Sequence, residues 1–386
     1  MSFDNLAILV FILTQCRITQ LWMQAARRRW SGRMLFAARA AIVAFDLLLA
    51  FGCLCSSSAF DGPGGIPARL ASPLGAATLI YVGIAATAVV VRELTRLISS
   101  RFDVATDPTR RRIVHTAGGA LLAAPFAAIG YGTLIGRSDF QIREVEIPIP
   151  NLPPDLEGLR ILQLSDIHLS AFLSEAELES VVDATAGLHP HLAVVTGDLI
   201  SSYGDPIDAC IRQLARVRAE AGVLGCLGNH ERYAAAEDYT TRAAARVGIQ
   251  FLRRQARQLR FGSSVLNVAG VDYQALKNKK QYLYGAERMV VPGAANLLLS
   301  HNPDVFPVAA RQGYNLMLAG HTHGGQVTVE ILDQSFSAAR FLTPYVYGLY
   351  REGSASAYVT RGIGTIGIPA RIGAPPEISL LRLRKA

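Results

Sequence analysis

The chain begins with long apolar stretches and changes, at about residue 138, to short apolar runs separated by polar segments. Each early stretch approaches the roughly 20 residues that a helix needs to cross a hydrocarbon layer about 30 Å thick. We therefore predict a transmembrane helical bundle over residues 1–137. Its four helices are expected at residues 6–23, 40–56, 74–91 and 117–134. Arg17 and Gln20 interrupt the first stretch, so three helices is the alternative. Asp46 lies in the second, where a carboxylate is costly unless it faces a partner helix.

From residue 138 to residue 386 the pattern predicts a separate α/β domain. Residues 140–150 alternate as a half-exposed strand does, and short apolar runs further on are typical of buried strands. These runs lie at residues 159–164, 192–196, 222–227, 264–271, 296–300, 314–318 and 356–360. Helices are expected between them at residues 175–186 and 206–219. Strands that alternate with helices favour an α/β fold.

The charge distribution predicts the orientation in the membrane. Residues 1–137 carry 14 basic and 6 acidic side chains, and residues 138–386 carry 24 of each, so the net charge of +8 belongs to the first third. Arginines cluster in residues 27–33 and 92–112, and such loops usually face the cytoplasm. With an even number of crossings, the C-terminal domain would then face the outside, in the periplasm of a cell with an inner membrane. Membrane lipid is the expected partner of the basic part, and nucleic acid is not.

Cysteine is sparse in the charged part of the chain, where only Cys210 and Cys226 occur. No CxxC or disulfide-dense pattern is present. We predict two unpaired, buried thiols, with a Cys210–Cys226 bridge as the alternative.

Five of the predicted strands end in residues of the types that bind metals. The blocks are Ser165-Asp-Ile-His168, Thr196-Gly-Asp198, Gly228-Asn-His-Glu231, Ser300-His-Asn-Pro303 and Gly320-His-Thr-His323. They hold five of the eight histidines. In an extended segment His321 and His323 would lie on one side, about 7 Å apart. That spacing suits two adjacent ions, or one ion if the backbone turns sharply at the flanking glycines.

Ligand sites in parallel α/β sheets lie just beyond the carboxyl ends of the strands. The blocks would therefore bring together seven nitrogen and oxygen ligands, namely Asp166, His168, Asp198, Asn229, His301, His321 and His323. One ion with an open position needs only three or four protein ligands, so seven suit two ions. Paired divalent ions can hold the attacking and the leaving oxygen of a phosphoryl displacement. The absence of cysteine favours Mn, Fe or Zn.

The series of blocks resembles the calcineurin-like metallophosphoesterase superfamily, and most closely the membrane-associated bacterial phosphodiesterases of the YkuE/YaeI type. Tyr345-Val-Tyr-Gly348 and Pro376-Glu-Ile378 extend the resemblance, which spans about residues 140–386. The resemblance implies a four-layer α/β/β/α sandwich, with two mixed sheets flanked by helices, after the transmembrane bundle.

The resemblance also implies how the ligands are shared. One ion would be held by Asp166, His168, Asp198 and His323. The second ion would be held by Asp198, Asn229, His301 and His321. Asp198 and a water or hydroxide would bridge the two ions. His230 is implied to donate a proton to the leaving oxygen or to stabilise charge, and a structural histidine bonded to a nearby carboxylate is the alternative.

These features predict a membrane-anchored, dinuclear metal-dependent phosphoesterase, a phosphoric ester hydrolase acting on phosphodiester or pyrophosphate bonds. Membrane tethering makes a lipid-linked or cell-envelope phosphoester the candidate substrate. The alternative is a membrane sensor or transport-associated protein that binds metal without hydrolysing a substrate. Residues 361–367, Arg-Gly-Ile-Gly-Thr-Ile-Gly, do not precede a helix pattern, so we interpret them as a turn beside the metal pocket and not as a dinucleotide site.

Overall fold

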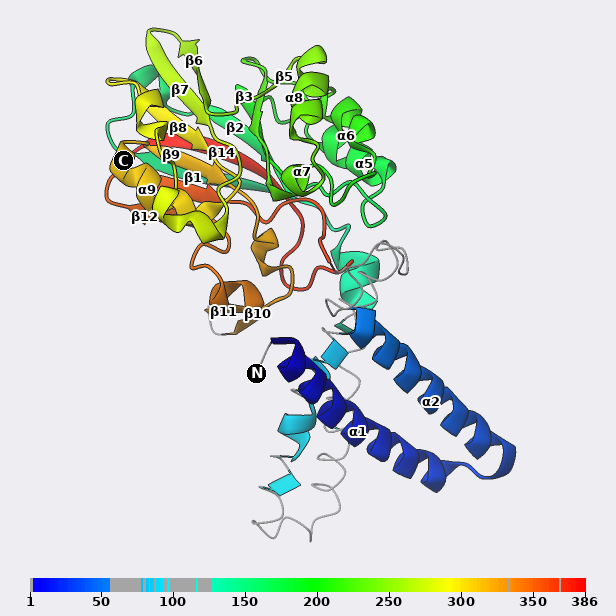
Figure 1. The fold of residues 1–386 in the computed structure, drawn as a ribbon. Helices are drawn as coiled ribbons and strands as arrows, with labels where there is room; N and C mark the ends of the chain where they lie inside the picture. The colour runs from blue at the N-terminus through cyan, green and yellow to red at the C-terminus, as the bar shows by residue number, and fades with distance from the viewer. Residues whose placement is uncertain are drawn as a thin grey trace. The chain divides into compact units, whose positions relative to one another are not determined.

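The computed structural model describes residues 3–55, 78, 81–82, 84–86, 88–93, 96–97, 116, 127–128, 130–331, 334–367 and 369–386. The chain divides into two compact units, Met1–Tyr131 and Gly132–Ala386, shown together in Figure 1. The membrane-spanning character of the first unit stays a prediction.

The N-terminal unit begins with two helices, α1 (Phe3–Arg29) and α2 (Gly32–Cys55), which contact each other. They cover the helices predicted at residues 6–23 and 40–56. Within the described residues, one segment is long and apolar enough to cross a membrane, Gly32–Gly52 in α2. The helix predicted at residues 74–91 is described only in part, and that at 117–134 lies mostly outside the described residues. The predicted transmembrane bundle is therefore not confirmed.

Polar residues inside these helices bond to one another. Asp46 of α2 accepts hydrogen bonds from Gln15 Nε2, at 2.7 Å, and from Thr19 Oγ1, at 2.9 Å, both on α1. Arg17 pairs with Glu93, with 2.7 Å between Nη2 and Oε1. Partners of this kind offset the cost of polar groups in apolar surroundings. Asp46 therefore faces a partner helix, as expected for a carboxylate in an apolar stretch.

The C-terminal unit contains two six-stranded mixed sheets within its described residues. The first sheet has the order β1 (Gln141–Ile149), β14 (Glu377–Lys385), β2 (Arg160–Leu164), β3 (Leu192–Thr196), β4 (Val223–Cys226) and β5 (Ile249–Phe251). The second has the order β12 (Gly348–Glu352), β13 (Ala355–Val359), β9 (Leu316–Ala319), β8 (Ala295–Leu299), β7 (Ser264–Gly270) and β6 (Gln255–Phe261). Strands β2 to β5 are mutually parallel, as are β13, β9, β8 and β7. Each parallel set therefore gathers its carboxyl ends along one edge.

Helices cover the outer faces of the two sheets (Figure 1). Helices α5 (Glu175–Ala184), α6 (Ile207–Leu214) and α8 (Glu237–Arg246) pack on the first sheet, and α9 (Phe306–Gln312) packs on the second. A separate apolar cluster fills the space between the two sheets. Ile161 of β2 belongs to this cluster, whereas its neighbour Leu162 belongs to the cluster on the other face of the first sheet, with residues of α5. The layers are thus helices, sheet, sheet and helix, so the predicted α/β fold with two mixed sheets flanked by helices is confirmed.

Shorter elements complete the unit. Helix α7 (Asn229–Tyr233) follows β4, and the hairpin β10 (Thr328–Ile331) and β11 (Gln334–Ser337) follows the last histidine block. Short 3₁₀ turns span Pro154–Leu156, Leu276–Gln281, Ala286–Met289, Pro303–Val305, His323–Gly325 and Ala338–Phe341, and a single π-helical turn spans Gly132–Gly136. Cys210 and Cys226 are buried and free, as predicted.

A buried amide joins the two sheets close to the ends of their strands. Gln163 of β2 is fully buried, and its Nε2 donates to Thr196 Oγ1 in β3 and to the Ala319 carbonyl in β9, both at 3.0 Å. Replacing it with leucine keeps the volume but removes both bonds and leaves polar atoms buried without a donor. We expect Gln163→Leu to lower the free energy of unfolding by about 1–2 kcal/mol in denaturant titration.

Gln258→Leu, on the exposed side of β6, is the matched control and should change stability by no more than about 0.5 kcal/mol. Equal stability of the two variants would contradict the role given to Gln163.

Candidate metal centre

All seven predicted ligands lie in the segments that follow parallel strands. Asp166 and His168 come after β2, Asp198 after β3 and Asn229 after β4, all in the first sheet. The remaining three come from the second sheet, His301 after β8 and His321 and His323 after β9. The candidate site is therefore assembled at the carboxyl ends of strands from both sheets.

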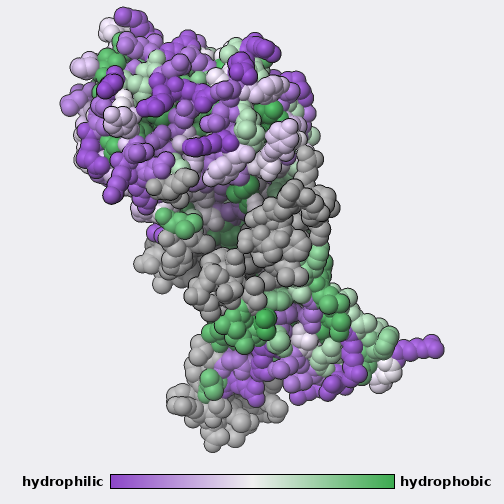
Figure 2. Space-filling model, in the orientation of Figure 1, coloured by the Kyte–Doolittle hydropathy of each residue, from purple (hydrophilic) through white to green (hydrophobic). Residues whose placement is uncertain are grey.

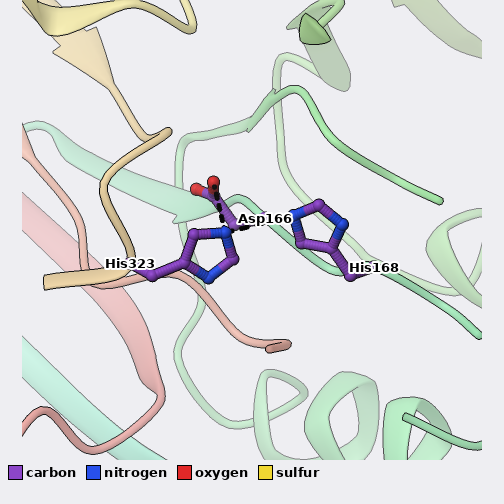
Figure 3. A group of neighbouring side chains, drawn as sticks. All are labelled: Asp166, His168 and His323. Carbon is purple, nitrogen blue, oxygen red and sulfur yellow. Dashed lines mark hydrogen bonds and ion pairs between the residues drawn. The ribbon is translucent and has the colours of Figure 1, made fainter. Parts of the chain in front are cut away.

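The ligand atoms of these residues lie close together. His168 Nε2 is 3.1 Å from His323 Nε2, which in turn is 3.4 Å from Asp166 Oδ1. Figure 3 shows the two imidazole rings and the carboxylate converging. Ligand atoms within 4.8 Å of one another form three groups, which are Asp166, His168 and His323; Asp198, His301 and His321; and His168, Asp198 and His230. The first two groups belong to the two predicted ligand sets.

Hydrogen bonds to the far side of the imidazole rings orient them. His301 Nδ1 is 2.6 Å from the Thr196 carbonyl, and His168 Nδ1 is 3.1 Å from Ser201 Oγ. A nitrogen that donates to a carbonyl carries a proton, so Nε2 is the nitrogen of His301 that would coordinate a metal, once a metal displaces the proton from it. Such bonds are the usual means of fixing a metal-binding histidine.

Several buried ligand atoms in the site lack a partner. Asp166 Oδ2, Asn229 Oδ1 and His301 Nε2 make no hydrogen bond. His301 Nε2 lies only 3.0 Å from Asp198 Oδ2, but without the alignment of a hydrogen bond. An unsatisfied buried polar group costs about 1–3 kcal/mol, and native proteins contain few of them. A divalent cation bound among these atoms would satisfy them, so the residues present fit a metal.

The electrostatics suit cation binding. Burial opposes the ionisation of Asp198, but the positive charge on His301 holds the pKa of Asp198 well below its usual value. Burial also opposes the protonation of His301, and Asp198 nevertheless raises its pKa to about 10. Burial and the charge of His301 lower the pKa of His321 to about 4. Burial likewise lowers the pKa of His168 and His323, so three imidazoles are neutral and able to coordinate a metal.

The backbone at the site is strained. Five of the seven candidates adopt left-handed φ angles, Asp166 (50°), His168 (49°), Asp198 (56°), His321 (77°) and His323 (53°). Such conformations cost of order 1–3 kcal/mol each in non-glycine residues and cluster at functional sites. The prediction that His321 and His323 share one side of an extended segment is wrong, because β9 ends at Ala319 and the chain then turns. The backbone turns sharply here, as the alternative prediction required. The alternative also placed both histidines on one ion, but their rings belong to different ligand groups.

Glycines allow the backbone to approach the two carboxylates. A Cβ atom at Gly228 would lie 2.1 Å from Asp198 Oδ1, and one at Gly320 would lie 2.2 Å from Asp166 Oδ2. Real Cβ atoms do not make such contacts, so only glycine fits at these positions.

Residues 159–325 match the family model described as calcineurin-like phosphoesterase. This chain contains a calcineurin-like phosphoesterase domain. The matched segment includes all seven candidate ligands, together with His230 and Glu231. The two-sheet architecture agrees with the fold that this family implied.

Curated relatives share the domain. The chain is 29% identical to a transmembrane protein with metallophosphoesterase domain from Danio rerio, over 76% of this chain and 67% of that protein. It is 29% identical to the metallophosphoesterase YkuE of Bacillus subtilis, over 72% of this chain and 98% of that protein. It is also 29% identical to the phosphodiesterase YaeI of Escherichia coli, over 58% and 82%. The chain thus spans about two thirds of the Danio rerio protein's length.

Among solved structures, the protein TT1561 of Thermus thermophilus aligns over 53% of this chain and 90% of its own. The sequence identity is 12% and the TM-score is 0.36.

Glu231 is a residue of this phosphoesterase domain whose role sequence reasoning missed. It is fully buried and accepts hydrogen bonds from the backbone N–H of Gly228, Asp198 and Leu199 at 2.7, 3.0 and 2.6 Å. Burial and the charge of Asp198 raise the pKa of Glu231. Its carboxylate ties the loop after β3 to the loop after β4, and thereby positions Asp198. The residue stood in the Gly228–Glu231 block, but only the fold shows what it bonds.

His230 stands at the edge of the site. Its Nδ1 is 2.6 Å from the Ser201 carbonyl, and its backbone N–H donates to Asp198 Oδ1 at 2.9 Å. The ring therefore bonds to a carbonyl, and not to a carboxylate as the structural alternative proposed. Its catalytic role stays a prediction.

Arg371 is a second residue that the sequence did not single out. Its side chain is fully buried and donates to the carbonyls of His323, Arg361, Gly362, Gly364 and Ala374. Burial lowers its pKa to about 10, so it stays charged at neutral pH. Gln326 supports the same loop, donating to the Ile366 carbonyl and accepting from the Ile366 N–H, both at 3.0 Å. Residues 361–367 therefore turn beside the candidate site, as the sequence predicted.

The hydrogen bonds of Glu231 lead to a testable prediction about metal affinity. Glu231→Gln replaces one accepting oxygen with an amide donor directed at backbone N–H groups, which should displace Asp198. We expect the affinity of the purified full chain for Mn²⁺ to fall about 10- to 100-fold in calorimetric titration.

Glu179→Gln, at an exposed position of α5, removes the same charge as a control and should leave the affinity unchanged. An unaltered dissociation constant for Glu231→Gln would show that the Asp198 loop does not depend on this carboxylate.

Proposed function

We propose that this chain is a membrane-anchored, dinuclear metal-dependent phosphoesterase that hydrolyses phosphodiester or pyrophosphate bonds of a lipid-linked or cell-envelope substrate. The observation that carries the proposal is the convergence of buried, unpartnered ligand atoms on Asp166, Asn229 and His301. Membership of the calcineurin-like domain family supports phosphoester hydrolysis as the reaction.

The donor set supports two metal ions. Asp166, His168, Asp198 and His323 would hold one ion, and Asp198, Asn229, His301 and His321 the other. Asp198 can offer one oxygen to each ion, and Asn229 adds a neutral oxygen that preserves the positive charge of the pair. When bound, the ions supply Lewis-acid activation of the attacking water and of the phosphoryl group. Mn, Fe and Zn all suit nitrogen and oxygen donors without cysteine.

His230 is suited to move a proton. One of its ring nitrogens lies within 4.8 Å of the ligand atoms of His168 and Asp198, and the Ser201 carbonyl fixes the ring through Nδ1. A proton held on Nε2 can then pass to the leaving oxygen of the ester, a step typically worth 10²- to 10⁴-fold in rate.

Membrane anchoring is supported by the N-terminal helices. Large apolar side chains on α1 and α2 are exposed, with Phe36 at 75%, Leu47 at 66% and Leu13 at 63%, as helices in contact with lipid require. In Figure 2 apolar and hydrophilic residues both show on these helices, whereas the visible face of the C-terminal unit is mostly hydrophilic. A relative from Danio rerio carries the name of a transmembrane protein. We propose four crossings in an inner membrane, with the catalytic domain outside the cytoplasm.

Two substitutions separate metal binding from proton transfer. Asp198→Asn should abolish hydrolysis of bis(p-nitrophenyl) phosphate and lower the metal content of the purified chain. His230→Gln should keep the metal content but lower kcat about 10²- to 10⁴-fold. Both are measured by turnover with added Mn²⁺ and by elemental analysis.

His189→Gln serves as the control, because His189 is exposed and stands outside the five ligand blocks. Full metal loading without turnover in the unmodified chain would refute hydrolysis and favour the non-hydrolytic sensor instead.

The orientation is tested with a reporter fused after Ala386. Alkaline phosphatase, which is active only outside the cytoplasm, should be active at this position, and a cytoplasmic reporter such as green fluorescent protein should be dark when exported unfolded. The reason is the clustering of arginine in the loops that the positive-inside rule assigns to the cytoplasm. The opposite pattern would place the catalytic domain inside and overturn the proposed topology.

A further inference from the structure

Two buried arginines flank the glycine-rich turn beside the candidate site, and their side chains differ in one respect. Arg371 is 1% exposed, and its guanidinium donates to five backbone carbonyls. Arg361 is 8% exposed, and its side chain makes no hydrogen bond or ion pair within the described residues. Arg371 is therefore satisfied by the protein itself, while Arg361 is a cation without an anionic partner in the described part of the chain.

Burying an unpaired charge is costly, so natural proteins rarely retain one without a ligand or a role. Arg361 Nε is wholly buried without a partner, and so is Thr365 Oγ1 from the same turn. The guanidinium carbon of Arg361 lies 4.3 Å from the centre of the Tyr347 ring. A cation–π contact of this kind holds the planar group in one orientation, but it satisfies none of its N–H donors.

The position of Arg361 places this cation next to the candidate metal ligands. A Cβ atom at Gly324, the residue after His323, would touch the Arg361 stem, with 2.7 Å to Cγ. Gly362, the residue after Arg361, lies against Asp166, where a Cβ atom would be 2.5 Å from that residue's Cβ. The Arg361 stem thus lies against the residue that follows His323, and the residue that follows Arg361 lies against Asp166. It is not among the three groups of converging ligand atoms.

We infer that Arg361, held flat by Tyr347, binds a second phosphate group of the substrate, the one next to the phosphate that reacts. The inference rests on the proposed function, and it narrows the substrate class to diphosphates and their esters. A guanidinium donates two parallel N–H bonds to phosphate oxygens, which gives both charge and geometry. Thr365 belongs to the same turn, and its buried hydroxyl has no partner within the described residues.

Binding of a diphosphate analogue tests the inference directly. The full chain, purified in detergent, loaded with Mn²⁺ and freed of excess metal, is titrated calorimetrically with methylenediphosphonate and with inorganic phosphate. Arg361→Gln should weaken binding of the diphosphonate about 10-fold and that of phosphate less than about twofold, because only the diphosphonate reaches Arg361. Equal weakening of both, or no weakening of either, would overturn the inference.

Arg311→Gln, on an exposed position of α9, removes the same charge and should leave both affinities unchanged. Arg361→Lys covers the case in which Arg361→Gln does not fold. Lysine keeps the charge but not the planar fork, so the diphosphonate should bind about threefold more weakly at full metal content. A specific site at Arg361 would be contradicted by two results together. Arg361→Lys would bind the diphosphonate as tightly as the unmodified chain, and Arg361→Gln would have the same effect as Arg311→Gln.

Failure of the proposed function would look different. A chain that does not hydrolyse bis(p-nitrophenyl) phosphate refutes the hydrolase, yet its binding of methylenediphosphonate can still depend on Arg361. Hydrolysis of the diester with diphosphonate binding that ignores Arg361 refutes only the further inference.

Discussion

The site depends on the burial of one carboxylate, Asp198, which is 2% exposed at the junction of the two sheets. An isolated carboxylate in such surroundings would be strongly disfavoured, so the protein must supply positive charge and donors around it. His301 lies 3.0 Å from one of its oxygens, and the backbone N–H of His230 donates to the other. Glu231 in turn holds the backbone of Asp198 in place. The glycine at position 228 is needed because nothing larger fits beside this carboxylate.

Much of this could be predicted from the sequence, because the information is local. Buried strands such as β3 and β4 are short apolar runs, and the residues after each run have the chemistry of ligands. The pattern therefore placed all seven candidates at strand ends, where the structure has them. It also indicated that Cys210 and Cys226 are buried and unpaired.

Other features depend on contacts between distant parts of the chain. Strand β14 lies between β1 and β2, although more than 200 residues separate it from them, and no local pattern shows that pairing. Its alternation of Leu381 and Leu383 with Arg382 and Arg384 is, however, a strand signal that was available. The left-handed turns at His321 and His323 replace the extended geometry expected of them, because packing between loops decides these angles. The role of Arg371 could not be predicted, because the fold brings together the five backbone carbonyls to which its guanidinium donates.

The ligands come from two sheets that otherwise meet through apolar contacts and through side-chain hydrogen bonds such as those of Gln163 and Tyr358. Asp166, Asp198 and Asn229 follow strands of one sheet, and His301, His321 and His323 follow strands of the other. Any ion held by both sets is also a crosslink between the halves of the sandwich. Cation occupancy and conformational stability are then one coupled equilibrium, in which the free concentration of the metal sets how firmly the two halves are held together.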